Sequence, residues 1–378
     1  MKKIWITIGA VVIVALAIVL TISQTKKEPE EIKIGAILPL SGEGAKYGVA
    51  TKRGIDLALK EINENGGVHK RKITIIYEDD RGEPTSGVSA ITKLIQIDKV
   101  PCILGPIYSS VALAVAPIAE KNKTVLLSPA ASAPALTKAG DYIFRNVLSD
   151  LYEASALAKY AYTSLGLRRV SILYINNDFG LGHKESFKSE FESLGGKIIS
   201  TESFEQDATD FRTQLTKLYK ENPEAVFLIG YREMGRVLRQ SAELGFHLRF
   251  ISFSMFEDPE ILKIAGNAAE GVYYSLQTFD PQSPEPVVKK FVENFRVAYH
   301  QDADIFAGLG YDAMKLLAVA LEKGGLNSEK IKSTLYQIKD FPGVTGKTSF
   351  DQNGDVSKTI SIKKVENGRF IWVIRNYQ

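Results

Sequence analysis

The fold class is decided by residues 32–78, which read "IKIGAILPLSGEGAKYGVATKRGIDLALKEINENGGVHKRKITIIYE". The apolar run 32–38 predicts a strand, residues 48–67 predict a helix that Gly66 and Gly67 end, and residues 72–78 predict a second strand. Segments of these lengths in this order favour a parallel strand pair with the helix as its crossover.

The same alternation continues to about residue 150 and then begins again. In the first block we expect further strands at 102–105 and 124–128, with helices at 84–97 and 109–121. In the second block we expect strands at 169–175, 197–204, 225–231 and 249–254, with helices at 151–166, 180–196, 210–223 and 233–245. The sequence therefore predicts an α/β fold of two blocks with parallel sheets, and a ligand cleft outside the carboxyl ends of the strands.

The end of the chain follows a different pattern. Helices are predicted at 286–300, 305–325 and 328–338, followed by antiparallel strands over residues 346–376. The pairs Asn353-Gly354 and Asn367-Gly368 predict hairpin turns between these strands.

The N-terminal segment has the composition of an export signal. Lys2 and Lys3 precede 19 uncharged residues, Ile4 to Ile22. This length lies between that of a cleaved signal peptide and that of a membrane span, and cleavage near Ala17 or after Ser23 is the alternative to an uncleaved anchor. Lysines before the span favour a cytoplasmic N-terminus. We expect an exported chain, periplasmic or at the cell surface, held on the cytoplasmic membrane by residues 4–22.

Composition excludes several kinds of partner and site. The net charge of +3 over 378 residues, without a basic stripe, is not typical of a nucleic-acid-binding protein. The single cysteine, Cys102, allows no intrachain disulfide and no cysteine-based metal site, and its apolar surroundings predict a buried thiol.

No catalytic arrangement is evident. His69, His183, His247 and His300 are scattered, and we interpret them as solvated; the run 78–80, Glu-Asp-Asp, is interpreted as a solvated strand end. The segment "GEGAKYG", residues 42–48, imitates a dinucleotide-binding loop, but its glycine spacing does not match. We therefore expect no cofactor, no metal and no enzymatic activity.

Small hydroxylic and aromatic residues follow three predicted strands of the first block. These residues are Ser41, Tyr47, Tyr108, Ser109, Ser110, Ser128 and Ser132. Ser109 and Ser110 begin a predicted helix, whose free N–H groups favour a carboxylate, although simple N-capping is the alternative. Phe179, Tyr231 and Phe306 are aromatic residues that could close a pocket over an apolar ligand group.

Eight segments, taken in their order and spacing, resemble the leucine/isoleucine/valine-binding family of type I periplasmic binding proteins, which serve ABC importers. They are "IKIGAILPLSGEGAKYG", "LALKEINENGGV", "GPIYSS", "LLSPAASAPAL", "FRN", "NNDFG", "LIGYREMGRVLRQSAELG" and "AGNAAEGV". The resemblance implies two Rossmann-like lobes, joined by three crossings, that close on the ligand by a hinge motion. It implies a first lobe of residues 32–149 and 278–343 and a second lobe of 150–277 and 344–378, after a signal or anchor and charged linker at 1–31.

The resemblance also implies a ligand site. The ligand carboxylate would meet Ser109, the Ala130 backbone and Ser132. The side-chain pocket would contain Tyr47, Ile107, Tyr108 and Phe306, with Phe179 and Tyr231 completing it from the second lobe.

Two positions depart from the amino-acid-binding members. Phe179 stands where they have a tyrosine, and Ser254 stands where they have the glutamate that pairs with the ligand ammonium; Glu257 lies three residues away. The resemblance implies a receptor that delivers a branched-chain or other small apolar amino acid to an ABC permease. An aromatic acid, an amide or a urea-type ligand remains open, as does a membrane-anchored ligand sensor.

Overall fold

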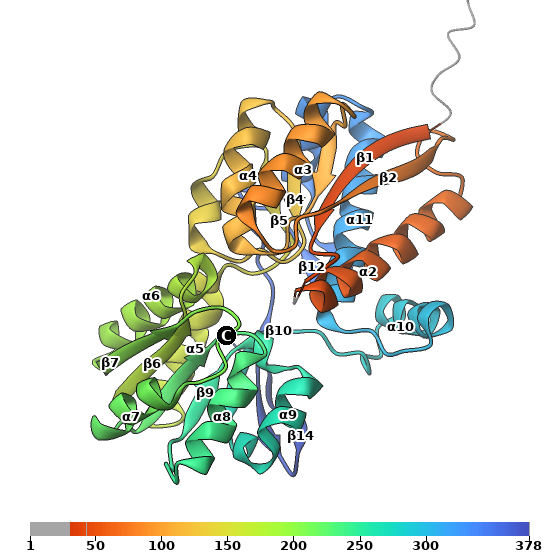
Figure 1. Ribbon diagram of the computed structural model, residues 1–378. Coiled ribbons are helices and arrows are strands. Elements are labelled where there is room, and N and C mark those ends of the chain that lie inside the picture. The colour runs from red at the N-terminus through yellow and green to blue at the C-terminus, as the bar shows by residue number, and fades with distance from the viewer. Residues whose placement is uncertain (1–30, 43, 378) are drawn as a thin grey trace, which may run out of the picture.

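Residues 31–42 and 44–377 are described by the computed structural model, in which they form two lobes joined by three chain crossings (Figure 1). The predicted span at residues 4–22 lies outside this range. Within the described range, no helix has both the length and the apolar character needed to cross a bilayer.

The first lobe contains a parallel sheet with strand order β2-β1-β3-β4-β5. Every residue of β3 and β4 is buried, as expected of parallel strands that helices cover on both faces. Its strands are β1 (Glu31–Leu38), β2 (Lys72–Asp79), β3 (Cys102–Leu104), β4 (Val125–Ser128) and β5 (Ile143–Arg145). Its helices are α2 (Ala45–Glu64), α3 (Pro84–Gln96), α4 (Ser109–Lys121), α10 (Pro286–Tyr299), α11 (Ile305–Gly324) and α12 (Ser328–Gln337).

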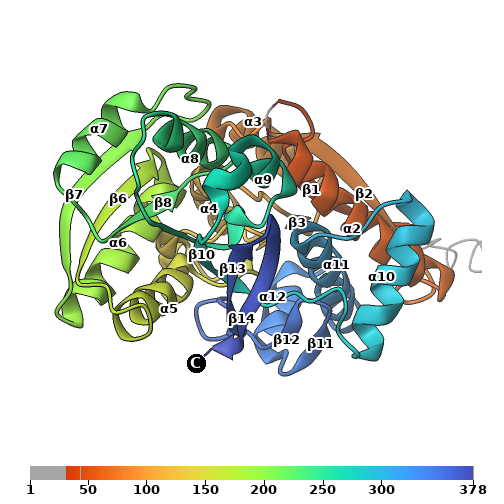
Figure 2. The same ribbon diagram turned by 90° about the horizontal axis from the view of Figure 1, so that it is seen from below.

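The second lobe contains a larger sheet with strand order β14-β13-β10-β9-β8-β6-β7 (Figure 2). Its strands pair in parallel from β7 to β10, and β13 and β14 add an antiparallel edge. The strands are β6 (Arg169–Ile175), β7 (Lys197–Phe204), β8 (Ala225–Ile229), β9 (Phe250–Ser252), β10 (Tyr273–Gln277), β13 (Ile360–Glu366) and β14 (Arg369–Tyr377). The helices are α5 (Asp150–Thr163), α6 (Asp178–Ser193), α7 (Arg212–Lys220), α8 (Glu233–Glu243) and α9 (Pro259–Ala265).

The predicted alternation and the two-lobe α/β fold are confirmed, with differences near the crossings. The sequence interpretation missed β5 and β10, which lie where the chain leaves one lobe for the other. The Asn367-Gly368 hairpin is confirmed between β13 and β14. The Asn353-Gly354 hairpin was wrong in part: only an isolated bridge, Phe350 to Val356, spans that turn, because β12 (Gly346–Thr348) pairs instead with β11 (Phe341–Gly343).

Helices α2 and α11 lie far apart in the sequence but pack at backbone distance. A Cβ atom on Gly54 would lie 1.9 Å from the carbonyl oxygen of Ala307, and one on Gly310 would lie 2.3 Å from that of Thr51. Only glycine permits so close an approach. This packing brings the Tyr47 ring of α2 to 4.9 Å, centroid to centroid, from the Phe306 ring of α11.

The crossings bond to one another between the lobes. They are residues 146–149, 278–285 and 349–359. The Leu148 N–H donates to Gln277 Oε1 at 3.0 Å, and the Thr278 N–H donates to the Thr359 carbonyl at 3.0 Å. The residues at which the two lobes divide remain a prediction.

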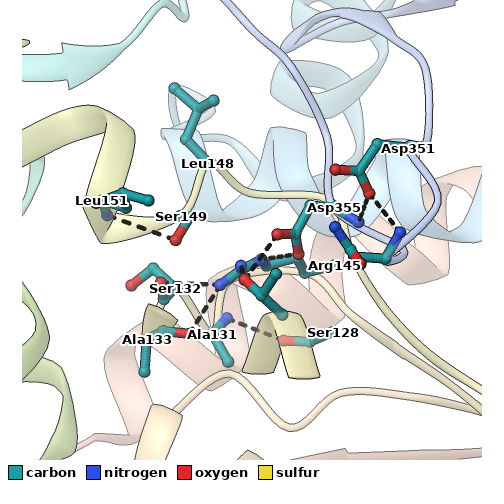
Figure 3. A network of polar contacts seen from close by, with 12 residues as sticks. Ser128, Ala131, Ser132, Ala133, Arg145, Leu148, Ser149, Leu151, Asp351 and Asp355 are labelled. Carbon is teal, nitrogen blue, oxygen red and sulfur yellow. Dashed lines mark hydrogen bonds and ion pairs between the residues drawn. The ribbon is translucent and has the colours of Figure 1, made fainter. Parts of the chain in front are cut away.

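The buried guanidinium of Arg145 holds the third crossing against β5 (Figure 3). Its Nε donates to Asp355 Oδ1 at 2.6 Å, and its Nη1 donates to the carbonyl oxygens of Ser132 and Ala133, each at 2.9 Å. Its Nη2 donates to Thr137 Oγ1 at 2.6 Å. One side chain therefore joins a crossing to the loop that follows β4.

Replacing Asp355 by alanine should strongly destabilise the protein, since it leaves the Arg145 cation buried without its anion. Loss of one partner of a buried ion pair costs about 3–5 kcal/mol in the free energy of unfolding. Chemical denaturation measures this change. Glu64→Gln is the control, because it breaks the exposed Lys60–Glu64 pair at 3.8 Å and should cost less than about 1 kcal/mol. Equal effects of the two substitutions would contradict the role given to Asp355.

Candidate functional site

A small cavity of about 30 Å³ lies between the lobes. Both lobes contribute to it, and eight of the ten residues expected at the site line it. The lining residues are Tyr47, Ile107, Tyr108, Ser109, Ala130 and Phe306 from the first lobe, and Phe179, Tyr231 and Met255 from the second. This volume is far below the about 300–1,000 Å³ of typical ligand pockets, so the lobes as they stand leave little room for a ligand.

The Tyr231 ring is the centre of the aromatic wall. It stacks on Phe179 at 5.1 Å and meets the Tyr108 ring edge-on at 5.5 Å, while Tyr47 lies 6.3 Å away. Tyr108 and Tyr47 belong to the first lobe, so these ring contacts cross the cleft. The lobes are therefore in a closed arrangement.

Glu233 holds the backbone of Tyr231 in this wall, and burial keeps the Tyr47 hydroxyl neutral. Glu233 Oε2 accepts a hydrogen bond from the Tyr231 N–H at 3.1 Å. Burial raises the pKa of the Tyr47 hydroxyl well above its usual value, and nearby Asp258 adds to the shift. The buried Tyr47 hydroxyl has no hydrogen-bond partner within residues 31–42 and 44–377, so it is a polar atom available to a ligand.

Ser109 begins α4 and organises the loop after β4. Its Oγ accepts hydrogen bonds from the N–H groups of Ser132, at 3.3 Å, and Ala133, at 3.2 Å. Ser128 Oγ accepts from the Ala131 N–H at 2.9 Å. In the described part of the chain, these contacts leave the Ala130 N–H without a hydrogen bond, on a residue that lines the cavity. A helix N-terminus, a hydroxyl and a backbone N–H thus meet at one end of the cavity, which is a suitable environment for a carboxylate.

Ser132 lies beside this end without lining the cavity. Among the described residues its hydroxyl forms no hydrogen bond, although its N–H binds Ser109 and its carbonyl binds Arg145. The structure therefore brings Ser132 next to Ser109, as expected. The backbone of Ser132, rather than its hydroxyl, forms the hydrogen bonds that hold the loop.

Ser254 also lies just outside the lining, immediately before Met255. Its N–H donates to Glu153 Oε1 at 2.8 Å, and its hydroxyl donates to Glu153 Oε2 at 3.1 Å. Glu257 does not take the place of the missing glutamate, because its carboxylate forms an ion pair with Lys363 of β13.

Two of the seven side chains interpreted as solvated are buried. His183 is 1% exposed, and its Nδ1 lies 3.2 Å from Asp150 Oδ2. Asp80 is fully buried, which raises its pKa to about 6, although the Gly82 N–H bonded to it opposes the shift. Asp79 behaves differently: it accepts hydrogen bonds from the Leu40 N–H and the Ser41 hydroxyl and so shapes the loop before α2.

Sequence reasoning missed Met255, Glu153 and the burial of His183. A signal for His183 was present, because Gly180, His183 and Phe187 fall three and four residues apart, on one face of α6, and all are buried. Glu153 carried no comparable signal, since its partner Ser254 is 101 residues away. The predicted burial of Cys102 is confirmed. Within the described residues, no group of three or more His, Cys, Asp or Glu side chains could hold a metal ion.

The substitutions Ser109→Ala and Ser132→Ala should differ in their effect on the ligand-free protein. Ser109→Ala leaves two buried N–H groups without an acceptor, and each such loss costs about 1–3 kcal/mol. Ser132→Ala removes no hydrogen bond seen in the structure and should change the free energy of unfolding by less than about 0.5 kcal/mol. Urea denaturation compares the two, and equal values would show that the Ser109 hydroxyl does not hold the loop.

Comparison with known proteins agrees with this geometry. The family described as periplasmic binding protein matches residues 31–369. The chain is 30% identical to the Leu/Ile/Val-binding protein BraC3 of Rhizobium johnstonii, over 90% of this chain and 93% of that protein.

Two solved structures extend the comparison. One is the branched-chain amino acid transporter substrate-binding protein LivJ of Streptococcus pneumoniae in complex with isoleucine, with 31% identity, a TM-score of 0.83 and coverage of 90% of this chain and 97% of that chain. The other is the solute-binding protein of an ABC transporter of Rhodopseudomonas palustris in complex with 3,4-dihydroxybenzoic acid, with 25% identity, a TM-score of 0.82 and coverage of 93% and 99%. A family match over nearly the whole described chain, together with these relatives, shows that this protein belongs to the periplasmic binding protein family.

Proposed function

We propose that this protein is the extracytoplasmic solute-binding component of an ABC importer, and that it binds a branched-chain or other small apolar amino acid. The observation that carries the proposal is the cavity itself: an aromatic wall from both lobes faces the N-terminus of α4, where Ser109 and the Ala130 N–H lie. An apolar side chain and a carboxylate, joined in one small molecule, match these two ends. The relative that holds isoleucine supports the assignment.

In this proposal the ten residues named from the sequence have distinct roles. The ligand carboxylate lies against Ser109, Ala130 and Ser132, and the ligand side chain lies against the aromatic and aliphatic residues. Ser254 lies near the ligand amine. The aliphatic and aromatic set is Tyr47, Ile107, Tyr108, Phe179, Tyr231 and Phe306.

Closure of the two lobes over the ligand is the proposed mechanism of capture. Lys46 of α2 forms an ion pair at 2.5 Å with Asp258 of the second lobe, and the Asp258 side chain is almost fully buried there. This contact exists only when the lobes meet. It joins the ring contacts of Tyr231 in stabilising the closed form, which an importer's permease would receive. The proposed location is outside the cytoplasm, with residues 4–22 as signal or anchor.

An aromatic acid is the second candidate for the ligand. Ser254 supplies no carboxylate of its own to an ammonium group, and five of the nine lining residues are aromatic. A carboxylate attached directly to an aromatic ring would fill the same two ends of the cavity. The relative that holds 3,4-dihydroxybenzoic acid makes this alternative concrete.

A ligand screen tests the proposal. We expect leucine, isoleucine or valine to raise the melting temperature and to give a calorimetric binding isotherm, because a ligand at 100 times its Kd stabilises the folded state by about 2.7 kcal/mol. Benzoate and 3,4-dihydroxybenzoate are the comparison ligands. Binding of these acids without any binding of amino acids would overturn the first assignment in favour of the second candidate.

Removal of the contact between the lobes should weaken capture without removing the site. Lys46→Gln should lower affinity for the best ligand about two- to fivefold, as expected for an ion pair whose lysine is 35% exposed and that contributes up to about 1 kcal/mol. Lys52→Gln is the matched control, because Lys52 pairs with Asp56 inside α2 at the same 2.5 Å distance. Calorimetry gives the affinities, and small-angle scattering gives the compaction on binding. An equal loss in both variants would contradict a role for Lys46 in closure.

A further inference from the structure

Glu153 is a buried carboxylate positioned behind the cavity. It lies in the first turns of α5 and is 4% exposed. Both of its oxygens bind Ser254, and Oε1 also accepts a hydrogen bond from the hydroxyl of Ser275 in β10 at 3.4 Å. Ser254 directly precedes the lining residue Met255, so the carboxylate is bound to a residue next to the cavity wall.

The same helix also reaches the carboxylate-binding end of the cavity. The Asp150 N–H, at the start of α5, donates to the Ser132 carbonyl at 2.9 Å. Glu153 follows within the next turn of the helix and contacts Ser254. The amino and carboxylate groups of an α-amino acid are attached to one carbon, so their binding groups must be neighbours. Helix α5 meets this requirement. Its Asp150 N–H binds the loop that follows β4, and its Glu153, three residues later, binds Ser254.

We propose that Glu153, acting through the Ser254 hydroxyl, provides the negative charge that selects a ligand with an ammonium group. This inference rests on the proposed function and names a specificity-determining residue for it. The Ser254 hydroxyl donates its hydrogen to Glu153, and its oxygen lone pairs remain to accept an ammonium N–H. Burial of an ammonium group without a nearby carboxylate is unfavourable in free energy. In this proposal Glu153 supplies the carboxylate indirectly, through the Ser254 hydroxyl.

The charges around Glu153 are consistent with this role. His183, from α6, and Asp150, from α5, face it, while Ser254 and Ser275 are neutral. Burial raises the pKa of Glu153 to about 7, although His183 opposes the shift. Burial lowers the pKa of His183, but the Asp150 carboxylate, 3.2 Å away, outweighs that effect and raises it.

The charge of Glu153 therefore changes near neutral pH. A ligand ammonium favours the ionised carboxylate. Affinity for an amino acid should then fall as the pH drops below about 7, where Glu153 takes up a proton before binding. A ligand without an amine should not show this loss.

The test compares leucine with 4-methylpentanoate, which has the same carboxylate and side chain but no amine. Glu153→Gln keeps the size of the side chain and removes its charge. We expect leucine affinity to fall tenfold or more, with 4-methylpentanoate affinity unchanged or higher. The fall in leucine affinity from pH 8 to pH 6 should disappear in the variant. Glu257→Gln, at a partly buried carboxylate that pairs with Lys363, is the control and should leave both ligands unaffected.

A double variant guards against a purely structural effect. Ser254→Glu combined with Glu153→Gln moves the carboxylate from α5 to position 254, with the glutamine amide able to donate to it, and should restore leucine binding. Failure of the wild-type protein to bind leucine would overturn the proposed function and the inference with it. Leucine binding that Glu153→Gln leaves intact would overturn the inference alone. Equal loss of both ligands, without rescue, would show that Glu153 only supports the fold.

Discussion

The hydrogen-bond partners of the buried Arg145 side chain determine both the shape of the loop after β4 and the attachment of the third crossing. A guanidinium removed from water must have its donors satisfied, and Arg145 meets this need with Asp355, Thr137 and two backbone carbonyls. Because a trans peptide directs its C=O and N–H groups in opposite directions, the Ser132 carbonyl that binds Arg145 leaves the Ala133 N–H directed toward Ser109. The geometry of the loop at the cavity and the attachment of the third crossing are thus two results of the same constraint.

The second lobe contributes packing rather than hydrogen bonding to the cavity wall. Tyr231 touches rings of both lobes, and its backbone is fixed by Glu233. Apolar contact of this kind depends on closeness more than on direction, so it is gained late in closure and lost early in opening. The polar contacts of Ser109 and its loop belong to the first lobe and do not depend on closure. A ligand carboxylate would therefore find its binding groups in place before Phe179 and Tyr231 of the second lobe reach the ligand.

Much of the fold was predictable because its signals are local. Strand and helix periods identified most elements, and the resemblance placed eight of the lining residues. Strands β5 and β10 were missed because they contain long polar residues, Arg145 and Gln277. Those side chains are buried because the crossings supply partners for them. The contact of Glu153 with Ser254 could not be predicted for a related reason: it depends on how α5 packs beside β9 and β10, which no local pattern records.

The glycine contact between α2 and α11 has a consequence for the order of synthesis. Helix α2 is made among the first residues of the chain, but the surface onto which Gly54 packs belongs to residues 305–324. A ribosome must complete the whole second sheet except its antiparallel edge before that surface exists. The first lobe therefore cannot reach its native packing while most of the chain is being made. Under the proposed export, this delay would keep the N-terminal lobe from folding prematurely at the ribosome.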